Sequence, residues 1–478
     1  MRIAFIHPDL GIGGAERLVV DAALGLQNEG HKVQIFTSHC DKSHCFEEVK
    51  NETLKTKVYG DFLPTNFLQK FKILFACLRQ LFLVIMLVIS GEISEYDYFI
   101  VDQLSICLPI LHLFQEKRSK TLFYCHFPDQ LLAKRTGLIR KIYRLPFDLI
   151  EQFTMSTADS IVVNSGFTKT VYDKTFTMIK DFNVPDVIYP CVDLSKETIT
   201  KETQDVFNDI VGEKTEYFLS INRFEKKKNI ELAIKSYKKF LEKNSNSQVK
   251  LIVAGGYDHK VEENKQYLAH LEKLSADLNL ETLTIFNNEY SKYSNLSKNY
   301  NIIFLPSISS NLKELLLSQT KLLIYTPSFE HFGIVPLEAM KFGVPVIAVN
   351  NGGPIESIIS IDENPELGTG WLEPSDPITW SEKLSKSLEI PKSKLIKNGS
   401  IQLNSKFSLK VMTESFEKNM LKTLKKPREK YTWETGMMLW KLPVFFILRK
   451  YFGMFQFVAL VALVGFYKLR PDYFQYYT

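Results

Sequence analysis

The chain has 478 residues, which is too long for one ordinary domain and suggests two or three. Hydrophobic residues make up 45% and charged residues 24%, as in globular proteins, and a net charge of +5 gives no reason to expect nucleic acid as a partner. The aromatic content is high, with 35 Phe and 21 Tyr, and points toward membrane contact.

The first residues read as the start of a nucleotide-binding fold, not as a secretory signal. A short strand, "RIAFI", runs into the loop "HPDLGIGG" (7–14), and a helix with apolar residues at helical spacing follows. The loop is not a dinucleotide fingerprint, because after Gly11 and Gly13 the third glycine would fall at Glu16. A glycine loop before a helix still suits a ligand that carries phosphate.

The stretch "SHCDKSHC" gathers four candidate metal ligands, His39, Cys40, His44 and Cys45. Their spacing lacks the CxxC and HxxxH pairs of ordinary structural zinc sites, so a metal site is the weaker interpretation. The six cysteines of the chain include no CxxC pair and are expected to be reduced and mostly buried.

Residues 67–90 are strongly apolar and are predicted to be a helix that contacts a membrane. The run 81–89 is too short to span a bilayer, and Arg79 interrupts the apolar residues before it. We therefore expect this helix to lie in the interface, or to be re-entrant. A buried core helix is the alternative.

Further strands are predicted at 98–102, 121–125 and 160–164, and His126 falls at the carboxyl end of the second of these. A charged stretch at 195–213 reads as an irregular linker between domains.

A second set of strands follows the linker. Two doubly wound α/β domains that face each other across a cleft are the natural architecture. An amphipathic helix is expected at 407–425. The strands of the second set are predicted at 217–221, 249–256, 283–286, 301–306, 321–326 and 344–349.

Two positive residues and two glycines come directly after strands of this second set. Arg223 and Lys228 follow the strand at 217–221, and Gly255 and Gly256 end the next one. A charge run is usually a solvated surface, but the carboxyl ends of parallel strands are where ligands bind. Arg and Lys beside a glycine turn suit a diphosphate. The chain contains no DxD sequence, so we expect no metal to neutralise that diphosphate.

The segment "FEHFGIVPLEAM" places two glutamates across a turn from a strand to a helix. Glu330 lies at the carboxyl end of the strand, and Glu338 lies in the first turn of the helix beside the N–H groups of Gly333, Ile334 and Val335. We expect Glu330 to meet a sugar, Glu338 to reach a ribose, and the three N–H groups to hold phosphate. The alternative is that Glu338 complements the helix dipole and Glu330 is solvated.

The C-terminal residues 426–478 are predicted to anchor the chain in a membrane. An apolar run at 451–467 has about the minimum length for a span, and Trp433 and Trp440 suit an interfacial belt. One span or two in-plane helices both fit.

These motifs match a known family. The E-x7-E motif, with R-x4-K upstream, resembles the retaining glycosyltransferases of the GT-B fold. Within them, "YCHFPDQLLAKR", "LIVAGGYD", "YTPSFEHFGIVPLEAM" and "VIAVNNGGPIES" look like the eukaryotic dolichol-pathway mannosyltransferases that add the second and third mannoses. The resemblance covers about residues 1–425.

The resemblance implies roles for the motif residues. Glu330 would lie against the transferred mannose, and Glu338 would bind the nucleotide ribose. Arg223 and Lys228 would hold the diphosphate as it leaves. His126 matches the cleft histidine that helps to position the donor sugar, so Glu330 and His126 are the two candidate catalytic residues.

Three further residues are expected to contact substrates. Gly13 and Gly14 match the glycine loop near the donor and acceptor phosphates, and His331 is a further donor contact. The resemblance divides the chain into an acceptor-binding Rossmann-like domain (1–205), a nucleotide-sugar-binding Rossmann-like domain (206–425) and the membrane anchor.

The resemblance also implies the substrates and the compartment. The donor would be GDP-mannose, and the acceptor a mannosyl-chitobiose diphosphate on dolichol, extended by an α-1,3 and then an α-1,6 linkage. No cofactor and no metal are expected. The catalytic domains would lie on the cytosolic face of the endoplasmic reticulum membrane, and other mannosyltransferases of the pathway are candidate partners.

Three rival interpretations remain open. A hydrolase could use Glu330 and Glu338 as a glycosidase pair, but then Arg223 and Lys228 would have no purpose. A membrane scaffold could keep the fold without activity, although the intact motif residues argue against that. A glycosyltransferase that acts on a different lipid acceptor is the strongest rival.

Overall fold

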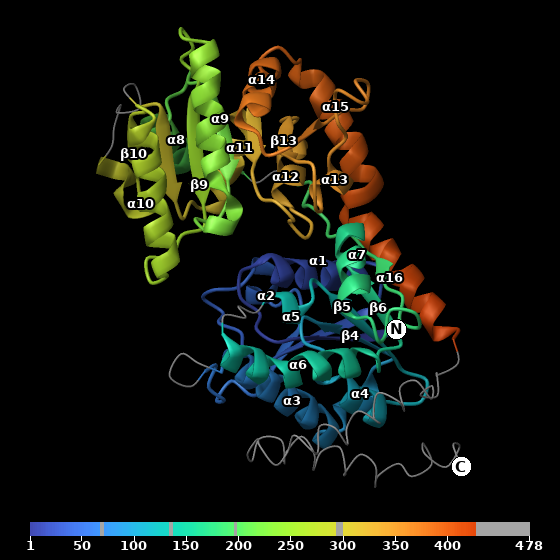
Figure 1. The fold of residues 1–478 in the computed structure, drawn as a ribbon. Coiled ribbons are helices and arrows are strands. Elements are labelled where there is room, and N and C mark those ends of the chain that lie inside the picture. Colours follow the sequence, from blue (N-terminus) through green and yellow to red (C-terminus); the bar gives the residue numbers. More distant parts are fainter. Residues whose placement is uncertain (67–70, 133–136, 196–197, 293–299, 427–478) are drawn as a thin grey trace. The chain divides into compact units, whose positions relative to one another are not determined.

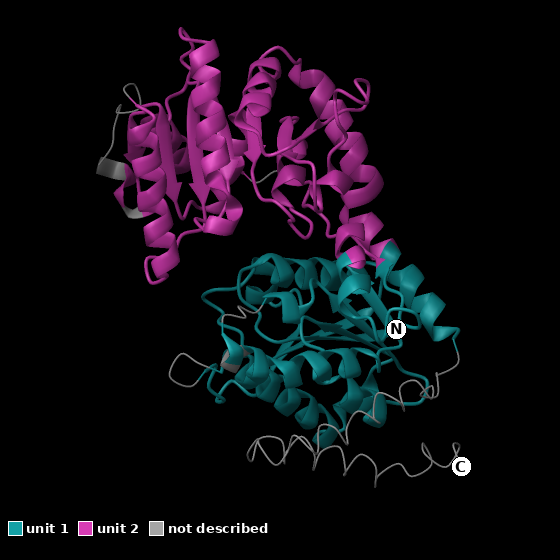
Figure 2. Cartoon of the chain, viewed as in Figure 1, with its two compact units in different colours: residues 1–163, 171–186, 415–478 teal, residues 164–170, 187–414 magenta. Residues whose placement is uncertain are grey.

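The computed structural model describes residues 1–66, 71–132, 137–195, 198–292 and 300–426. The chain forms two compact units, and neither is a continuous stretch of sequence (Figures 1 and 2). Unit 1 comprises 1–163, 171–186 and 415–478, and unit 2 comprises 164–170 and 187–414. The predicted anchor at 427–478, with Trp433 and Trp440, lies outside the described residues.

Unit 1 is built on a sheet of seven strands in the order β3-β2-β1-β4-β5-β6-β7. The pairs from β3 through β6 are parallel, and most of their residues are apolar because helices cover both faces. The strands are β1 (Arg2–His7), β2 (Lys32–Thr37), β3 (Thr56–Val58), β4 (Tyr98–Asp102), β5 (Lys120–Cys125), β6 (Ser160–Val163) and β7 (Asp186–Val187).

Two helices include residues of both units. The first is α7 (Gly166–Thr175), and the second is α16 (Leu409–Leu424), which confirms the amphipathic helix predicted at 407–425. The other helices of unit 1 are α1 (Gly14–Asn28), α2 (Glu47–Lys50), α3 (Lys72–Ile89), α4 (Leu108–Phe114), α5 (Asp129–Leu132) and α6 (Leu138–Met155).

The end of α16 completes unit 1. The ring of Phe416 stacks on Tyr124 of β5 with the ring centroids 6.0 Å apart, and Ser160 donates a hydrogen bond of 2.8 Å to Asn419. Farther along the sheet, Glu417 pairs with His31 at 2.9 Å. The second half of α16 therefore packs against the N-terminal sheet.

Unit 2 repeats the design with a seven-stranded parallel sheet in the order β10-β11-β9-β8-β12-β13-β14. Successive strand residues enter different cores: Phe218 packs with α9, α10 and α14, whereas Leu219 packs with α8, α11 and α12. The strands are β8 (Tyr217–Ile221), β9 (Lys250–Gly255), β10 (Thr282–Thr284), β11 (Ile302–Pro306), β12 (Leu322–Tyr325), β13 (Val346–Val349) and β14 (Gly370–Glu373). The helices are α8 (Lys201–Ile210), α9 (Ile230–Lys243), α10 (Glu262–Asp277), α11 (Ser310–Gln319), α12 (Val335–Lys341), α13 (Pro354–Ser357), α14 (Pro377–Ser387) and α15 (Lys392–Gln402).

The expectation of an irregular linker at 195–213 was wrong, because α8 occupies most of it. Thr200 caps this helix by accepting a hydrogen bond from the N–H of Thr203. Phe207 and Ile210 are buried in the core of unit 2. These apolar residues have helical spacing, but the charged residues between them hid the pattern.

The apolar segment near residue 80 forms one continuous helix, α3, which is long and apolar enough to cross a membrane, although a buried core helix can also meet these criteria. Arg79 does not break its outer surface, because the guanidinium points inward and donates a hydrogen bond of 3.0 Å to the carbonyl of Ser38. Leu78, Ile85 and Ile89 are exposed on the outer side.

Candidate active site

The loop between β12 and α12 carries Glu330, and its carboxylate meets a lysine from a distant part of the chain. Lys228 Nζ lies 2.5 Å from Glu330 Oε2. Both side chains are mostly buried, with 14% and 22% exposed, so the pair is only partly screened by water. The two predicted site residues that come from different strands, β8 and β12, are thus brought together.

The conformation and hydrogen bonds of the backbone position Lys228. It ends a 3₁₀ turn (Lys226–Lys228) after β8, and the next residue, Asn229, has a positive φ of 49° that turns the chain into α9. Thr326, directly after β12, donates a hydrogen bond of 2.6 Å to the carbonyl of Lys228. Two neighbouring parallel strands therefore end at the ion pair, which fixes the positions of its charges.

Arg223 behaves differently, since its side chain is 67% exposed and lies 3.5 Å from Glu225. Burial by itself would raise the pKa of Glu225, but Lys227, Arg223 and Lys228 lower it, so the carboxylate is held in its charged form. The Arg223 guanidinium remains accessible to an anionic ligand.

Gly255 and Gly256 make room for protein atoms. A Cβ on Gly255, which has a φ of +140°, would lie 2.2 Å from the carbonyl oxygen of Asn222. A Cβ on Gly256 would lie 2.9 Å from the Cγ of Arg223. Both glycines therefore let the end of β9 pack against the segment that carries Arg223.

Gly333 lies above a buried tyrosine. Its φ is +84°, and a Cβ there would be 2.9 Å from the hydroxyl of Tyr325. Tyr325 is 3% exposed, and burial, with the charges of Glu330 and Glu338, holds its pKa well above the ordinary value. The Tyr325 side chain is therefore uncharged and packs under the loop that connects the two glutamates.

Glu338 lies in the first turn of α12, as predicted, and has its own lysine partner. Lys313 Nζ of α11 lies 2.7 Å from Glu338 Oε1, while Oε2 is buried with no hydrogen-bond partner among the described residues. Each glutamate of the motif thus pairs with one lysine. Ile334 and Val335 lie at the beginning of the same helix.

A second loop, after β13, supports the first. The side chain of Asn351 accepts a hydrogen bond of 2.6 Å from the N–H of Phe329, and the N–H of Gly353 donates one of 2.7 Å to the carbonyl of Glu330. A Cβ on Gly352, which has a φ of +71°, would be 2.6 Å from that carbonyl oxygen. The "NNGG" sequence lets the two loops pack closely.

The backbone of His331 contacts the first turn of α7. Ser165 donates a hydrogen bond of 2.5 Å to the carbonyl of His331. Glu356 accepts hydrogen bonds of 2.7 Å from the N–H groups of Gly166 and Phe167. Residues 164–170 therefore belong with the loop that carries Glu330, although they are distant in sequence.

Unit 1 holds the other predicted site residues. Gly13 is the N-cap of α1 in an extended conformation, and a Cβ there would meet the carboxylate of Glu16. Gly14 begins the helix with open space around it, which a ligand can approach. His126 directly follows β5. Its Nε2 atom lies 2.5 Å from the carboxylate of Asp102.

No group of three or more His, Cys, Asp or Glu side chains could hold a metal ion in the described part of the chain. In the cluster at 39–45, His39 pairs with Asp61 at 2.6 Å, and the Cys45 thiol lies 3.7 Å from the carbonyl of Lys42. Burial and the nearby Cys45 raise the pKa of Cys40 to about 11, which disfavours the thiolate that a metal binds.

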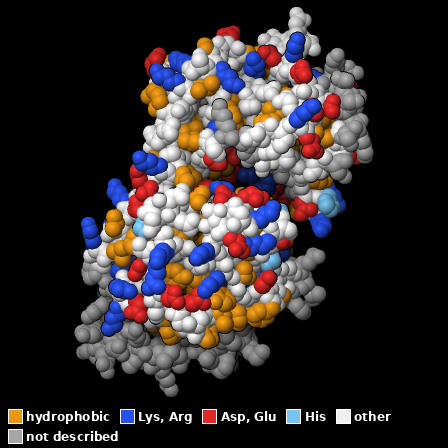
Figure 3. Space-filling model, turned by 180° about the vertical axis from the view of Figure 1, so that it is seen from behind, with side chains coloured by type: hydrophobic (Ala, Val, Ile, Leu, Met, Phe, Trp, Pro, Cys, Tyr) orange, Lys and Arg blue, Asp and Glu red, His pale blue; other side chains and the backbone are white. Residues whose placement is uncertain are grey.

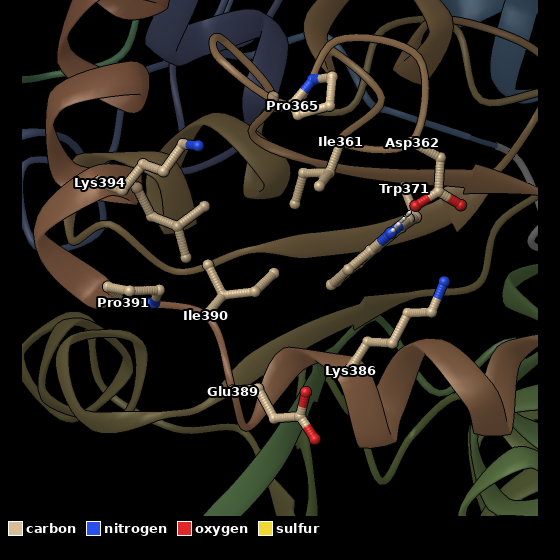
Figure 4. Close-up of a pocket in the computed structure, with 11 residues that line it drawn as sticks. Ile361, Asp362, Pro365, Trp371, Lys386, Glu389, Ile390, Pro391 and Lys394 are labelled. Carbon is tan, nitrogen blue, oxygen red and sulfur yellow. Dashed lines mark hydrogen bonds between the residues drawn. The ribbon is translucent and has the colours of Figure 1, made fainter.

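A pocket of about 440 Å³ lies elsewhere in unit 2, between β14, α14 and α15 (Figure 4). Trp371 lines this pocket and donates a hydrogen bond of 3.1 Å to Asp362. None of the predicted site residues lines this pocket.

Comparisons with known proteins place the chain in a family. Residues 12–196 match the model of Glycosyltransferase Family 4, and residues 202–401 match that of Glycosyl transferases group 1. The chain is 55% identical to Alpha-1,3/1,6-mannosyltransferase ALG2 of Saccharomyces cerevisiae over 90% of this chain and 87% of that protein. It is 49% identical to the protein of the same name from Debaryomyces hansenii over 94% and 97%. The chain belongs to the alpha-1,3/1,6-mannosyltransferase family.

Solved structures of other proteins share the fold of this mannosyltransferase family member. Sucrose-phosphate synthase of Thermosynechococcus elongatus has a TM-score of 0.64 at 18% identity, over 88% of this chain and 98% of that one. A glycosyltransferase from Rickettsia africae has a TM-score of 0.61 at 16% identity, over 89% and 99%. The two parallel sheets and these likenesses confirm the predicted GT-B fold.

Several residues of the candidate site were not predicted from the sequence. Lys313, Tyr325 and Glu356 become visible only when separate strands and helices are brought together. Asp102 ends a predicted strand at the ligand-binding edge of the sheet, so its position was a usable signal.

Proposed function

We propose that this mannosyltransferase transfers mannose from GDP-mannose to Man1GlcNAc2-diphosphodolichol, in α-1,3 linkage, and then to the Man2 product, in α-1,6 linkage. The ion pair between Lys228 and Glu330 carries the proposal, because it places a positive and a negative group together at the ends of β8 and β12. The names of the curated relatives support the two linkages.

Lys228 and Arg223 suit the diphosphate of the donor. A bound diphosphate supplies negative charge that competes for Lys228 and leaves Glu330 to face the sugar. Arg223 is exposed and can approach the same anion. Charge on the departing GDP is then neutralised by side chains, with no metal or other cofactor in the proposed reaction.

Glu330 stabilises positive charge that develops on the mannose, and Glu338 accepts hydrogen bonds from the ribose hydroxyls. The acceptor hydroxyl attacks C1 on the face from which the diphosphate departs. The C1–O bond to phosphate breaks as the new C1–O bond forms, and the proton of the acceptor passes to the leaving phosphate oxygen. The configuration at C1 is retained.

The lipid acceptor requires a membrane, and unit 1 has an apolar side that suits one. Figure 3 shows hydrophobic side chains gathered in the lower part of the coloured surface in that view. The α6 helix adds to the exposed residues of α3, and a ring contact of 5.8 Å between Phe71 and Tyr143 joins the two segments. The exposed residues of α6 are Leu138, Ile142, Leu145 and Leu149. We place the enzyme on the cytosolic face of the endoplasmic reticulum membrane, where other mannosyltransferases of the pathway are candidate partners.

A glycosidase pair is not favoured. A hydrolase of that type needs one protonated and one ionised carboxyl group that are both available to the substrate. In this structure the carboxylates of Glu330 and Glu338 each contact a lysine, so neither is free to act on a substrate as one member of such a pair.

The test uses the full chain in vesicles with GDP-mannose and a synthetic Man1GlcNAc2-diphosphate lipid. We expect two mannoses to be added by the wild type, and none by Glu330→Ala. The control is Asp362→Asn, which removes a carboxylate that pairs with Lys383 at another place in unit 2. Addition of only one mannose would contradict the proposal that the enzyme makes both linkages. Hydrolysis of GDP-mannose without transfer would contradict the proposed identity of the acceptor.

A further inference from the structure

Four ionisable side chains, in which carboxylates and imidazoles alternate, form a row at the carboxyl edge of the sheet in unit 1. Glu16 lies 3.9 Å from Nε2 of His7, and Nδ1 of His7 lies 2.8 Å from Asp102. The other carboxylate oxygen of Asp102 lies 2.5 Å from Nε2 of His126. The row thus links the first turn of α1 to the end of β5.

The centre of the row is buried and its ends are accessible. His7 and Asp102 are each 1% exposed, whereas the side chains of Glu16 and His126 are each 21% exposed. Buried charges are costly unless they are paired, so a row that crosses the interior of a fold needs a reason. A network with a purely structural role would not need to end in two groups that a ligand can reach.

The charges of the two central residues support each other. Burial by itself would lower the pKa of His7, but the hydrogen bonds and charges of Asp102 and Glu16 raise it from 6.5 to about 9. Burial would raise the pKa of Asp102, but His126 and His7 lower it to about 2. At neutral pH, therefore, a buried His7 cation faces a buried Asp102 anion.

The contact with Asp102 also orients His126. Its Nε2 atom is buried against the carboxylate, and the side chain keeps 21% of its surface exposed, so a ligand can reach the ring only from a side other than Nε2. The ring of Tyr124 lies beside it, with 4.9 Å between the ring centroids. A ring nitrogen and a carboxylate oxygen this close favour a proton on Nε2, and with it one tautomer and one direction of the ring.

We propose that Asp102 is a positioning residue that holds the imidazole of His126 in one orientation for the donor sugar, with His7 as its buried counter-ion. The inference rests on the proposed function, because that function assigns His126 to the sugar. His7 and Asp102 touch no substrate. They act by keeping the imidazole in one orientation, much as carboxylates orient the histidines of other active sites.

A buried pair in the same sheet shows what a structural role looks like. Lys120 Nζ lies 2.9 Å from Asp159, and the two side chains are 5% and 6% exposed. Asp159 also accepts a hydrogen bond of 2.9 Å from the N–H of Thr121. This pair has no exposed end, so Asp159→Asn is a matched control for the loss of a buried carboxylate.

The test is a double-mutant cycle on the full chain in vesicles, with kcat and the KM for GDP-mannose as readouts. We expect Asp102→Asn to lower kcat about 10- to 100-fold with little change in KM, because the nucleotide is held by unit 2. In a His126→Ala background the same substitution should change kcat less than about twofold. Effects that multiply, or an equal loss of kcat in Asp159→Asn, would overturn the proposal.

A second readout needs no activity and separates this inference from the proposed function. Histidine-selective ¹⁵N NMR of the full chain in lipid reports which nitrogen of each ring carries a proton, and His126→Gln assigns the signal. We expect a proton on Nε2 of His126 in the wild type and a mixture of tautomers in Asp102→Asn. An unprotonated Nε2 in the wild type would overturn the positioning role even if mannose is transferred. The expected tautomer without transfer would reject the proposed function alone.

Discussion

Lys228 and Glu330 are 102 residues apart in the chain, yet Lys228 Nζ and Glu330 Oε2 lie 2.5 Å apart. Parallel strands produce this contact, since β8 and β12 are neighbours in the sheet and both point their carboxyl ends to the same edge. The pair therefore links the two halves of the donor motif, R-x4-K and E-x7-E.

Substitution of Lys228 should impair the reaction far more than substitution of its neighbour. In Lys228→Met, Glu330 loses its lysine partner and the diphosphate loses a cation, so we expect kcat/KM to fall about 100-fold or more. Lys227→Met is the control, because the side chain of Lys227 is 69% exposed and pairs with Glu225. Initial rates with GDP-mannose measure both. Equal losses in the two variants would show that net charge, and not the ion pair, matters.

Gly333→Ala should destabilise unit 2. The substitution forces a non-glycine residue to a φ of +84° and places a Cβ 2.9 Å from the Tyr325 hydroxyl. We expect a loss of about 1–3 kcal/mol in the free energy of unfolding. Denaturant titration measures it, and Tyr325→Phe in the same chain should recover part of the loss. No recovery would mean that the backbone conformation alone is responsible.

Gly14→Ala should separate stability from function. Nothing lies within 4 Å of a Cβ at Gly14, which starts α1, so the folded state should not lose stability. If the glycine loop lies against substrate phosphates, mannose transfer should still fall, by about 10-fold or more. Thermal unfolding and transfer assays on one preparation test both. Unchanged transfer would remove Gly14 from the site.

The stability of unit 1 should decrease in alkali through His7. The pKa of His7 is raised to about 9 in the folded state, so its contribution is fully present below about pH 6.5 and is lost as the pH rises through about 9. Between pH 6.5 and 9.5 the melting temperature should therefore fall more in the wild type than in His7→Gln. His31→Gln is the control, because it removes another partly buried histidine–glutamate pair. Parallel curves for the wild type and His7→Gln would contradict the assigned charge.

The outer side of α3 should contact lipid. In vesicles that contain a photoactivatable phospholipid, we expect cross-links on Leu78, Ile85 and Ile89 of the full chain. Leu83 and Leu87, which are buried on the opposite side of the same helix, provide the internal control. Mass spectrometry of the digested protein locates the adducts. Labels that are absent from α3 but present elsewhere would show that another segment holds the membrane.

Much of the fold was predictable from apolar strands and from the residues that follow them. The strands of both sheets that lie near the site were expected, and Glu330 and Lys228 were both placed at strand ends. The short strands β3, β7 and β14 and the helix α8 were missed, because two to four residues give little periodicity and charged residues masked the helix.

The partners of the motif residues could not be predicted in the same way. The sequence around Lys313 does not mark it as a site residue. Only the packing of α11 beside α12 brings this lysine to Glu338. Gly255, Gly256 and Gly333 were expected to leave room for a ligand. In the structure they leave room for Asn222, Arg223 and Tyr325, which are long-range neighbours that no local pattern reveals.

The return of α16 to unit 1 has a consequence for synthesis on the ribosome. The N-terminal sheet emerges first from the ribosome. Its contacts with α16 cannot form until that helix has been translated; they join Tyr124 to Phe416, Ser160 to Asn419 and His31 to Glu417. Nearly 300 residues, including most of unit 2, are translated between β5 and the helix that covers it. The nascent first half must therefore leave an apolar surface open until α16 has been translated, so chaperone binding during elongation should concentrate on that surface.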